Sequence, residues 1–92
     1  MTFEWSRRKA QLNLRKHGVS FEEAKTVFAN PLARIHDDPD HSVGESREFI
    51  IGNSSRDRLL VCFVERTTTV TRIFSARETT THERRDYEEN TY

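Results

Sequence analysis

The segment Leu59 to Val64 limits the possible folds more than any other part of the sequence. Its six residues, Leu-Leu-Val-Cys-Phe-Val, are all apolar and form the only long apolar run in the chain. A membrane-spanning helix needs roughly 20 apolar residues, so this run is too short to cross a membrane. Because apolar and polar residues do not alternate here, we expect a strand that lies in the middle of a sheet and is covered on both faces.

The length of the chain limits how those two faces are covered. Residues 1–92 are enough for a single domain, in which 34% hydrophobic and 33% charged residues predict a thin core under a solvated surface. The one cysteine, Cys62, lies inside the apolar run, which predicts a buried thiol rather than a disulfide or a paired-cysteine metal site. A lone thiol and the lack of an apolar stretch behind the basic N-terminus predict a cytoplasmic protein.

Two helices are predicted before the sheet. Ser6 is a suitable N-cap for a helix over residues 7–17, and Gly18 occupies a position where helices often end in a left-handed residue. A capping box follows, in which Ser20 accepts from the Glu23 amide and the Glu23 carboxylate reaches back. The second helix has apolar residues at a period of 3.6 and ends at an Asn-Pro pair.

Four strands and a third helix are expected after these two helices. The predicted strands span residues 32–37, 47–52, 58–65 and 68–75. A second capping box, Thr80 to Glu83, predicts a helix that runs to about residue 89. Phe3 and Trp5 alternate with polar residues and indicate a short extended segment at the start. The expected fold is therefore α+β: two N-terminal helices, a four-stranded antiparallel sheet and a C-terminal helix.

Charge is distributed unevenly although the net charge is zero, with 15 basic and 15 acidic residues. Residues 1–17 are basic, whereas residues 36–48 and the last fifteen residues are acidic. Zero net charge argues against a simple nucleic-acid-binding protein, but a local positive field can still bind phosphate.

A metal site is not expected. The acidic segment contains two histidines and three aspartates in a short stretch: His36, Asp37, Asp38, Asp40 and His41. Their spacing does not match a fixed metal-ligand pattern, and the glycines form no phosphate-binding loop. We therefore predict neither a metal nor a cofactor.

Residues along nearly the whole chain resemble the BrnT toxins of bacterial toxin–antitoxin systems. The resemblance is carried by the Phe3-Glu4-Trp5 opening, Lys9, the stretch Asn13 to Ala24, the stretch Phe28 to Leu32, Glu45 and Arg47, and the endings Ile73 to Arg77 and Glu83 to Glu88. Ser6 stands where the family usually has Asp, but both residue types cap helices.

This resemblance implies a fold similar to RelE-type ribonuclease toxins and an activity that cleaves RNA and stops translation. It also implies a BrnA-type antitoxin with a ribbon-helix-helix DNA-binding part, which masks the toxin. Operator DNA would then be bound only indirectly, through that antitoxin.

RNA cleavage without a metal requires a base, an acid and cations. The ribose 2′-hydroxyl is the nucleophile, so its proton must be removed, the leaving oxygen protonated and the phosphorane charge stabilised. Arginine suits the last role because it stays charged and contacts two phosphate oxygens at once. The candidate catalytic residues are Arg77, Arg47, His17 and Arg72. The candidate RNA-binding residues are Lys9, Lys16, Arg85 and Tyr87.

Each candidate also has a purely structural interpretation. The arginines can form ion pairs or bind backbone carbonyls, and Lys9 and Lys16 can belong to a solvated helix face. His17 can supply a favourable charge at a helix C-terminus. Tyr87 can pack its ring against the sheet instead of stacking on a base.

Two other functions remain open at this point. The chain can be a non-catalytic module that holds a DNA-binding partner protein. It can also be a helix-turn-helix domain built from the first two helices. Glu22 and Glu23 lie where base contacts would fall in that motif, and they would repel phosphate.

Overall fold

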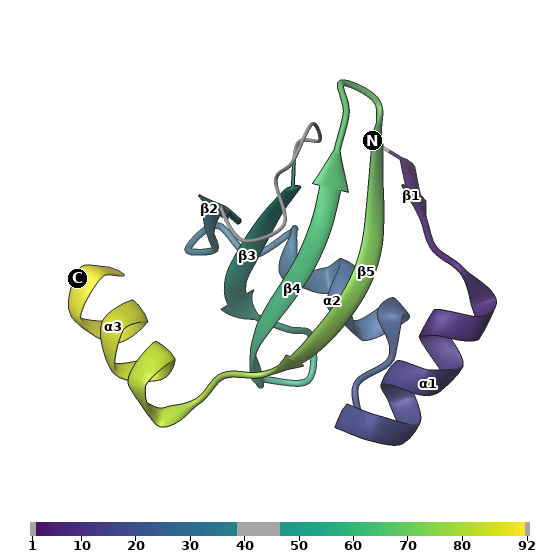
Figure 1. The fold of residues 1–92 in the computed structure, drawn as a ribbon. Helices are drawn as coiled ribbons and strands as arrows, with labels where there is room; N and C mark the ends of the chain where they lie inside the picture. Colours follow the sequence, from purple (N-terminus) through teal and green to yellow (C-terminus); the bar gives the residue numbers. More distant parts are fainter. Residues whose placement is uncertain (1, 39–46, 92) are drawn as a thin grey trace.

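The computed structural model of the chain describes residues 2–38 and 47–91, in which five strands form one mixed sheet (Figure 1). The elements in chain order are β1 (Thr2–Glu4), α1 (Arg7–His17), α2 (Phe21–Val27), β2 (Arg34–Asp37), β3 (Arg47–Asn53), β4 (Leu59–Arg66), β5 (Val70–Glu78) and α3 (Thr81–Thr91). The strand order is β1-β5-β4-β3-β2, so β4 is central as its apolar run predicts. The α+β class and the three helices are confirmed.

The prediction of a four-stranded, fully antiparallel sheet was wrong. β1 is a fifth strand, and it pairs parallel to β5 from Thr2↔Val70 to Glu4↔Arg72. The sequence indicated only a short extended segment here, because three residues are too few for alternation to reveal a partner or a direction. The long connection through α1, α2 and the meander allows the parallel arrangement, which a short hairpin loop would not.

The end of β5 also differs from the prediction. The strand continues to Glu78, so Arg77 lies within it rather than after its end. A bulge lies in the β4–β5 pairing, where Phe63 is opposite Ser75 and Val64 is opposite Ile73. Phe74 is therefore the extra residue on β5, and a bulge of this kind redirects the side chains around it.

Buried apolar residues cover both faces of β4. Leu60, Cys62 and Val64 belong to the core under α1 and α2, whereas Leu59 and Val61 pack with Tyr87 of α3 on the other face. This confirms the prediction that β4 is covered on both sides. The thiol of Cys62 is fully buried, and burial raises its pKa to about 12, which keeps it protonated.

The two predicted capping boxes have different outcomes. At Thr80 both bonds form, because the Glu83 amide donates to Thr80 Oγ1 at 3.1 Å and the Thr80 amide donates to the Glu83 carboxylate at 2.8 Å. At Ser20 the Glu23 amide donates to Ser20 Oγ at 3.0 Å. The Glu23 carboxylate does not reach back; it accepts instead from Arg58.

This buried carboxylate joins α2 to the β3–β4 turn. Ser54 Oγ also donates to Glu23, at 2.7 Å, and the Glu23 side chain is only 3% exposed. The hydrogen bond from Arg58 holds the Glu23 pKa below its usual range, against the opposing effect of burial. No helix in the described part of the chain is long and apolar enough to cross a bilayer.

Candidate functional site

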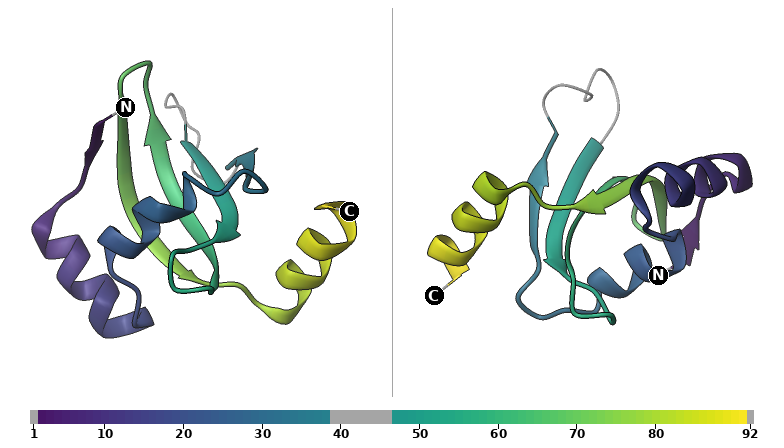
Figure 2. Two further views of the ribbon diagram at one scale, coloured as in Figure 1. Left: turned by 180° about the vertical axis from the view of Figure 1, so that it is seen from behind. Right: turned by 90° about the horizontal axis from the view of Figure 1, so that it is seen from below.

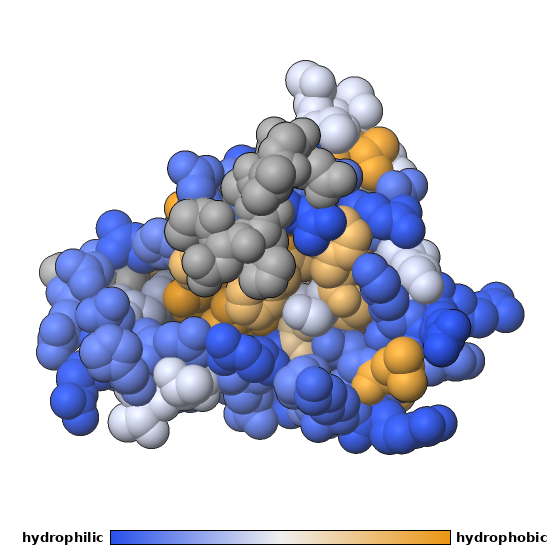
Figure 3. Space-filling model, viewed as in Figure 1, coloured by the Kyte–Doolittle hydropathy of each residue, from blue (hydrophilic) through white to orange (hydrophobic). Residues whose placement is uncertain are grey.

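The candidate site lies on the sheet face opposite α2, at the β5 edge beside α1. In Figure 2, α2 crosses one face of the sheet, α1 flanks the β5 edge and α3 leaves the end of β5 to one side. Strand alternation places Arg47 and Phe49 of β3, Phe63 of β4 and Arg77 of β5 on the opposite face. Figure 3 shows that apolar residues gather at the centre of this face, with hydrophilic residues around them.

Three cations surround the ring of Phe74 on this face. Arg47 Cζ lies 4.0 Å from the ring centroid, Lys9 Nζ lies 4.8 Å away and Arg72 Cζ lies 6.0 Å away. They come from β3, α1 and β5, so only the tertiary fold brings them together. The negative face of an aromatic ring attracts such cations. The result is a local positive field, of the kind that binds phosphate.

Carboxylates lie beside two of these cations. Arg47 Nε is 3.9 Å from Glu65, and Arg72 is 3.0 Å from Glu4. The Arg72 and Glu4 side chains are 40% and 52% exposed, and ion pairs at such exposure contribute about 0–1 kcal/mol. A phosphate group can therefore compete with Glu4 for Arg72.

Glu65 is a candidate site residue that the sequence reasoning missed. It lies directly opposite Arg47 on β3 and opposite Arg72 on β5, between the two arginines in one cross-strand row. A carboxylate in this position can accept a proton. The alignment of Arg47, Glu65 and Arg72 follows from the strand register, and no sequence motif indicates it.

The end of α1 joins the same cluster. Lys9, Lys16 and His17 line a shallow depression of about 230 Å³ together with Phe74 and Ser75. Five of the predicted site residues therefore lie around Phe74: Lys9, Lys16, His17, Arg47 and Arg72. They supply cations and one imidazole, which are groups that can hold a phosphate and move a proton.

Arg77 lies next to this cluster and also holds α3. Its guanidinium is 5.6 Å from the Phe63 ring, and its two terminal nitrogens donate to the Glu83 carboxylate at 2.8 and 2.9 Å. This bidentate contact lowers the pKa of Glu83 to about 2. Arg77 therefore forms an ion pair, as its structural interpretation expected, and also lies beside the cluster.

The structure does not bring Arg85 or Tyr87 to the cluster. Tyr87 is 8% exposed, packs against Ile51, Leu59 and Val61, and donates its hydroxyl to the Leu32 carbonyl at 2.8 Å. Its ring is part of the core in this structure, as the structural interpretation expected, and offers no open face for a base. Arg85 is exposed on the side of α3 that faces away from the sheet.

The structure also bears on the acidic segment and on the suggested helix-turn-helix. Among residues 2–38 and 47–91, no three His, Cys, Asp or Glu side chains are grouped to hold a metal, while Asp40 and His41 lie outside the described residues. The second helix of the suggested helix-turn-helix is α2. It buries Phe21, Ala24 and Val27 in the core, which leaves little of this short helix to enter a DNA groove.

The fold and the site define a class: a small α+β protein in which basic side chains gather on one sheet face. A family model described as "Ribonuclease toxin, BrnT, of type II toxin-antitoxin system" matches residues 5–83. The chain belongs to this BrnT family of ribonuclease toxins, and membership of a type II system implies a cognate antitoxin.

A solved structure supports the fold independently. The crystal structure of the Brucella abortus ribonuclease toxin BrnT superposes with a TM-score of 0.68, covering 87% of this chain and 97% of that one. The two sequences are 18% identical, so this likeness concerns the fold alone. No curated protein sequence matches the chain.

Proposed function

We propose that this chain is a metal-independent endoribonuclease whose active site is the cationic cluster around Phe74. The observation that carries the proposal is the gathering of Lys9, Arg47 and Arg72 within 6.0 Å of one ring. The carboxylates of Glu65 and Glu4 lie beside the two arginines, and a bound anion would add to this compensation of positive charge from three separate elements. A scissile phosphate is the anion that a ribonuclease must stabilise.

The proposed reaction is an internal phosphoryl transfer. The ribose 2′-oxygen forms a bond to phosphorus while the bond from phosphorus to the 5′-oxygen breaks, leaving a 2′,3′-cyclic phosphate and a free 5′-hydroxyl. Arg47 and Arg72 bind the non-bridging oxygens and stabilise the added charge of the phosphorane. Glu65, which lies between them in the strand register, accepts the 2′-hydroxyl proton.

The second proton transfer is assigned to His17. It lines the same depression as Phe74, and an imidazole can donate a proton to the leaving 5′-oxygen near neutral pH. Lys9 and Lys16 hold the adjoining phosphates, and Arg77 contacts the RNA beside Phe63. Because cleaved messenger RNAs cannot be translated in full, the expected cellular effect is inhibition of translation.

We also propose that the partner is a BrnA-type ribbon-helix-helix antitoxin, which acts in the cytoplasm and covers the cationic face. The toxin would reach operator DNA only through that partner. The zero net charge and the exposed acidic side chains of α3 fit a protein that does not bind DNA by itself.

The test is a cleavage assay on the purified protein, free of antitoxin, with a long single-stranded RNA and EDTA. Arg72→Gln is the test variant, and Arg56→Gln is the matched control. Arg56 is 72% exposed on the turn at the other end of β3 and β4, and its replacement changes the charge by the same amount. We expect Arg72→Gln to cut at least about 100-fold more slowly and Arg56→Gln to cut normally.

Three other results would each contradict part of this proposal. Normal cutting by Arg72→Gln would remove Arg72 from the active site. Cutting that stops in EDTA would contradict metal independence. If the parent cuts neither free RNA nor RNA on translating ribosomes, the chain is instead a binding module that holds a DNA-binding partner.

A further inference from the structure

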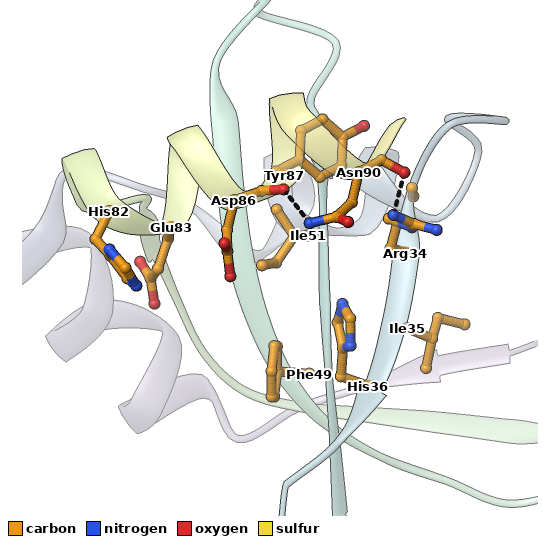
Figure 4. A pocket seen from close by; sticks show the side chains of 11 residues that line it. Arg34, Ile35, His36, Phe49, Ile51, His82, Glu83, Asp86, Tyr87 and Asn90 are labelled. Carbon is orange, nitrogen blue, oxygen red and sulfur yellow. Dashed lines mark hydrogen bonds between the residues drawn. The ribbon is translucent and has the colours of Figure 1, made fainter. Parts of the chain in front are cut away.

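A second cavity lies between α3 and the sheet, beside the cationic cluster. Its volume is about 640 Å³, within the range of small-molecule sites. Its polar and aromatic lining comes from β2, β3 and α3, and includes Arg34, His36, Phe49, His82, Asp86 and Asn90. Figure 4 shows that side chains of α3 face those of β2 and β3 across this cleft.

Stacked rings form one wall of the cleft. The imidazole of His36 lies on the Phe49 ring, with centroids 5.0 Å apart and planes inclined by 23°. Phe49 in turn lies 6.0 Å from Phe63, and these residues are direct cross-strand neighbours on one sheet face. Aromatic rings on a sheet are a common platform for unstacked bases of single-stranded RNA.

This row of rings connects the cleft with the proposed active site. Arg77 lies 5.6 Å from Phe63, and Phe63 is opposite Ser75, the neighbour of Phe74. On β3, Arg47 precedes Phe49 by two residues and shares its face, a separation of about 7 Å along a strand. A strand of RNA whose phosphate is held at Phe74 therefore has its neighbouring bases beside this row.

The opposite wall of the cleft offers a hydrogen-bond acceptor. The Asp86 carboxylate makes no hydrogen bond or ion pair within residues 2–38 and 47–91, and Figure 4 shows it directed from α3 towards the strands. The Asn90 side chain donates to the Asp86 carbonyl at 2.8 Å, and Arg34 donates to the Asn90 carbonyl. These contacts hold this part of α3 over β2.

The charged groups of the cleft lie in two places. Arg77 already neutralises Glu83, and Arg34 lies at the Asn90 end, where it donates to the Asn90 carbonyl. Beside the stacked rings, the Asp86 carboxylate would repel a phosphate. A neutral flat ring with N–H donors on its edge fits between stacked rings and a carboxylate. Guanine has such an edge, because N1–H and the N2 amino group lie side by side and suit a two-oxygen acceptor.

We propose that this cleft binds one unstacked base of the RNA substrate and that Asp86 makes it prefer guanine. The inference rests on the proposed function, since it describes a base-binding subsite next to the proposed cleavage site. His36 and Phe49 supply the stacking surface, and Asp86 accepts from the guanine edge. Cleavage should therefore occur preferentially at a fixed distance from a guanine.

Binding can be tested without cleavage. The probes are fluorescent 2′-O-methyl oligouridines that carry one central guanine, inosine or adenine, since a 2′-O-methyl group removes the nucleophile. We expect the parent protein to bind the guanine probe about tenfold more tightly than the adenine probe. Inosine lacks the N2 amino group, so we expect an intermediate affinity for that probe.

Two variants on α3 form a matched pair, because each removes one negative charge. Asp86→Asn should abolish the guanine preference, whereas Glu89→Gln, on the side of α3 away from the sheet, should keep it. His36→Ala should weaken binding of every probe by a similar factor. Circular dichroism would confirm that each variant is folded.

The outcomes separate this inference from the proposed function. RNA cleavage without a guanine preference, or a preference that persists in Asp86→Asn, would overturn the base site and leave the ribonuclease standing. A guanine preference in a protein that never cuts RNA would support the site and overturn the nuclease. If no probe binds but His36→Ala and Asp86→Asn weaken antitoxin binding, the cleft is a protein-docking surface and the inference is wrong.

Discussion

The side chain of Asn13 binds both backbone groups of Ala76. Its Oδ1 accepts from the Ala76 N–H at 3.1 Å, and its Nδ2 donates to the Ala76 carbonyl at 2.8 Å. Nδ2 also donates to the Val19 carbonyl at 2.9 Å. The parallel pairing of β1 with β5 ends at Arg72, and beyond that point the Asn13 side chain forms hydrogen bonds with the edge of β5. This contact holds the end of α1, with His17, beside Phe74.

The first prediction concerns this anchor. Asn13 is 6% exposed, and Asn13→Ala would leave the backbone groups of Ala76 and Val19 without their partner. We expect unfolding free energy to fall by about 2–4 kcal/mol, as measured by urea denaturation. Gln11→Ala, at an exposed position of the same helix, is the control and should change it by less than about 0.5 kcal/mol. A loss below about 1 kcal/mol in Asn13→Ala would contradict the anchoring role.

The second prediction separates the two roles of Arg77. Both Arg77→Ala and Glu83→Gln break the contact that ties α3 to β5, but only Arg77→Ala removes a cation from the proposed RNA face. We expect Arg77→Ala to slow RNA cleavage by about 100-fold or more, whereas Glu83→Gln should stay within a few-fold of the parent. Equal losses in the two variants would show that Arg77 acts only by holding α3.

The third prediction is a dependence of stability on pH. Arg77 lowers the pKa of Glu83 from 4.5 to about 2, and Arg58 lowers that of Glu23. A depressed pKa in the folded state stabilises the protein above the unfolded pKa, and this contribution disappears as pH falls from about 4.5 towards 2. For Glu83, which is 28% exposed, we expect a loss of about 1–3 kcal/mol over that interval.

Urea denaturation at pH 6 and at pH 3 measures this effect. Glu83→Gln cannot titrate at this position, so its stability should fall less between the two pH values than that of the parent. An identical fall in both proteins would mean that the Arg77–Glu83 contact is not formed in solution.

The fourth prediction concerns the salt dependence of RNA binding. If Arg72 neutralises one phosphate, Arg72→Gln should reduce the slope of log affinity against log salt concentration by about 0.7, the value for single strands. Arg56→Gln, on the exposed turn, should leave the slope unchanged. The measurement is anisotropy titration of a non-cleavable oligouridine between 50 and 200 mM salt, about the range in which such slopes are resolved. Equal slopes for Arg72→Gln and the parent would show that no phosphate lies on Arg72.

Local patterns predicted most of the secondary structure but little of the pairing. The caps at Ser6, Ser20 and Thr80 all form, because an N-cap depends on residues within one turn. Both hydrogen bonds of the capping box form between Thr80 and Glu83, but only one of the two forms between Ser20 and Glu23. Only the fold places Arg58 beside Glu23, and that contact is the stronger alternative for its carboxylate.

For the candidate site, the sequence predicted which types of residue take part but not how they are arranged in space. Arginine and histidine candidates could be chosen because cleavage requires cations and a proton donor. Glu65 and Phe74 were missed as candidates, since their positions beside the arginines come from the strand register and from the bulge opposite Phe63. Tyr87 fits either a core or a surface position in sequence, and its burial against Val61 decided between them.

The sequence by itself determined the α+β class, the three helices and the central, doubly covered β4, because each depends on periodicity, capping or an uninterrupted apolar run. Only the tertiary structure decided the parallel pairing of β1, the gathering of Lys9, Arg47 and Arg72 at Phe74, and the cleft under α3. Those features join residues far apart in the chain. The strand register, the bulge and the docking of the helices decide where those residues meet. All three depend on how the whole core packs.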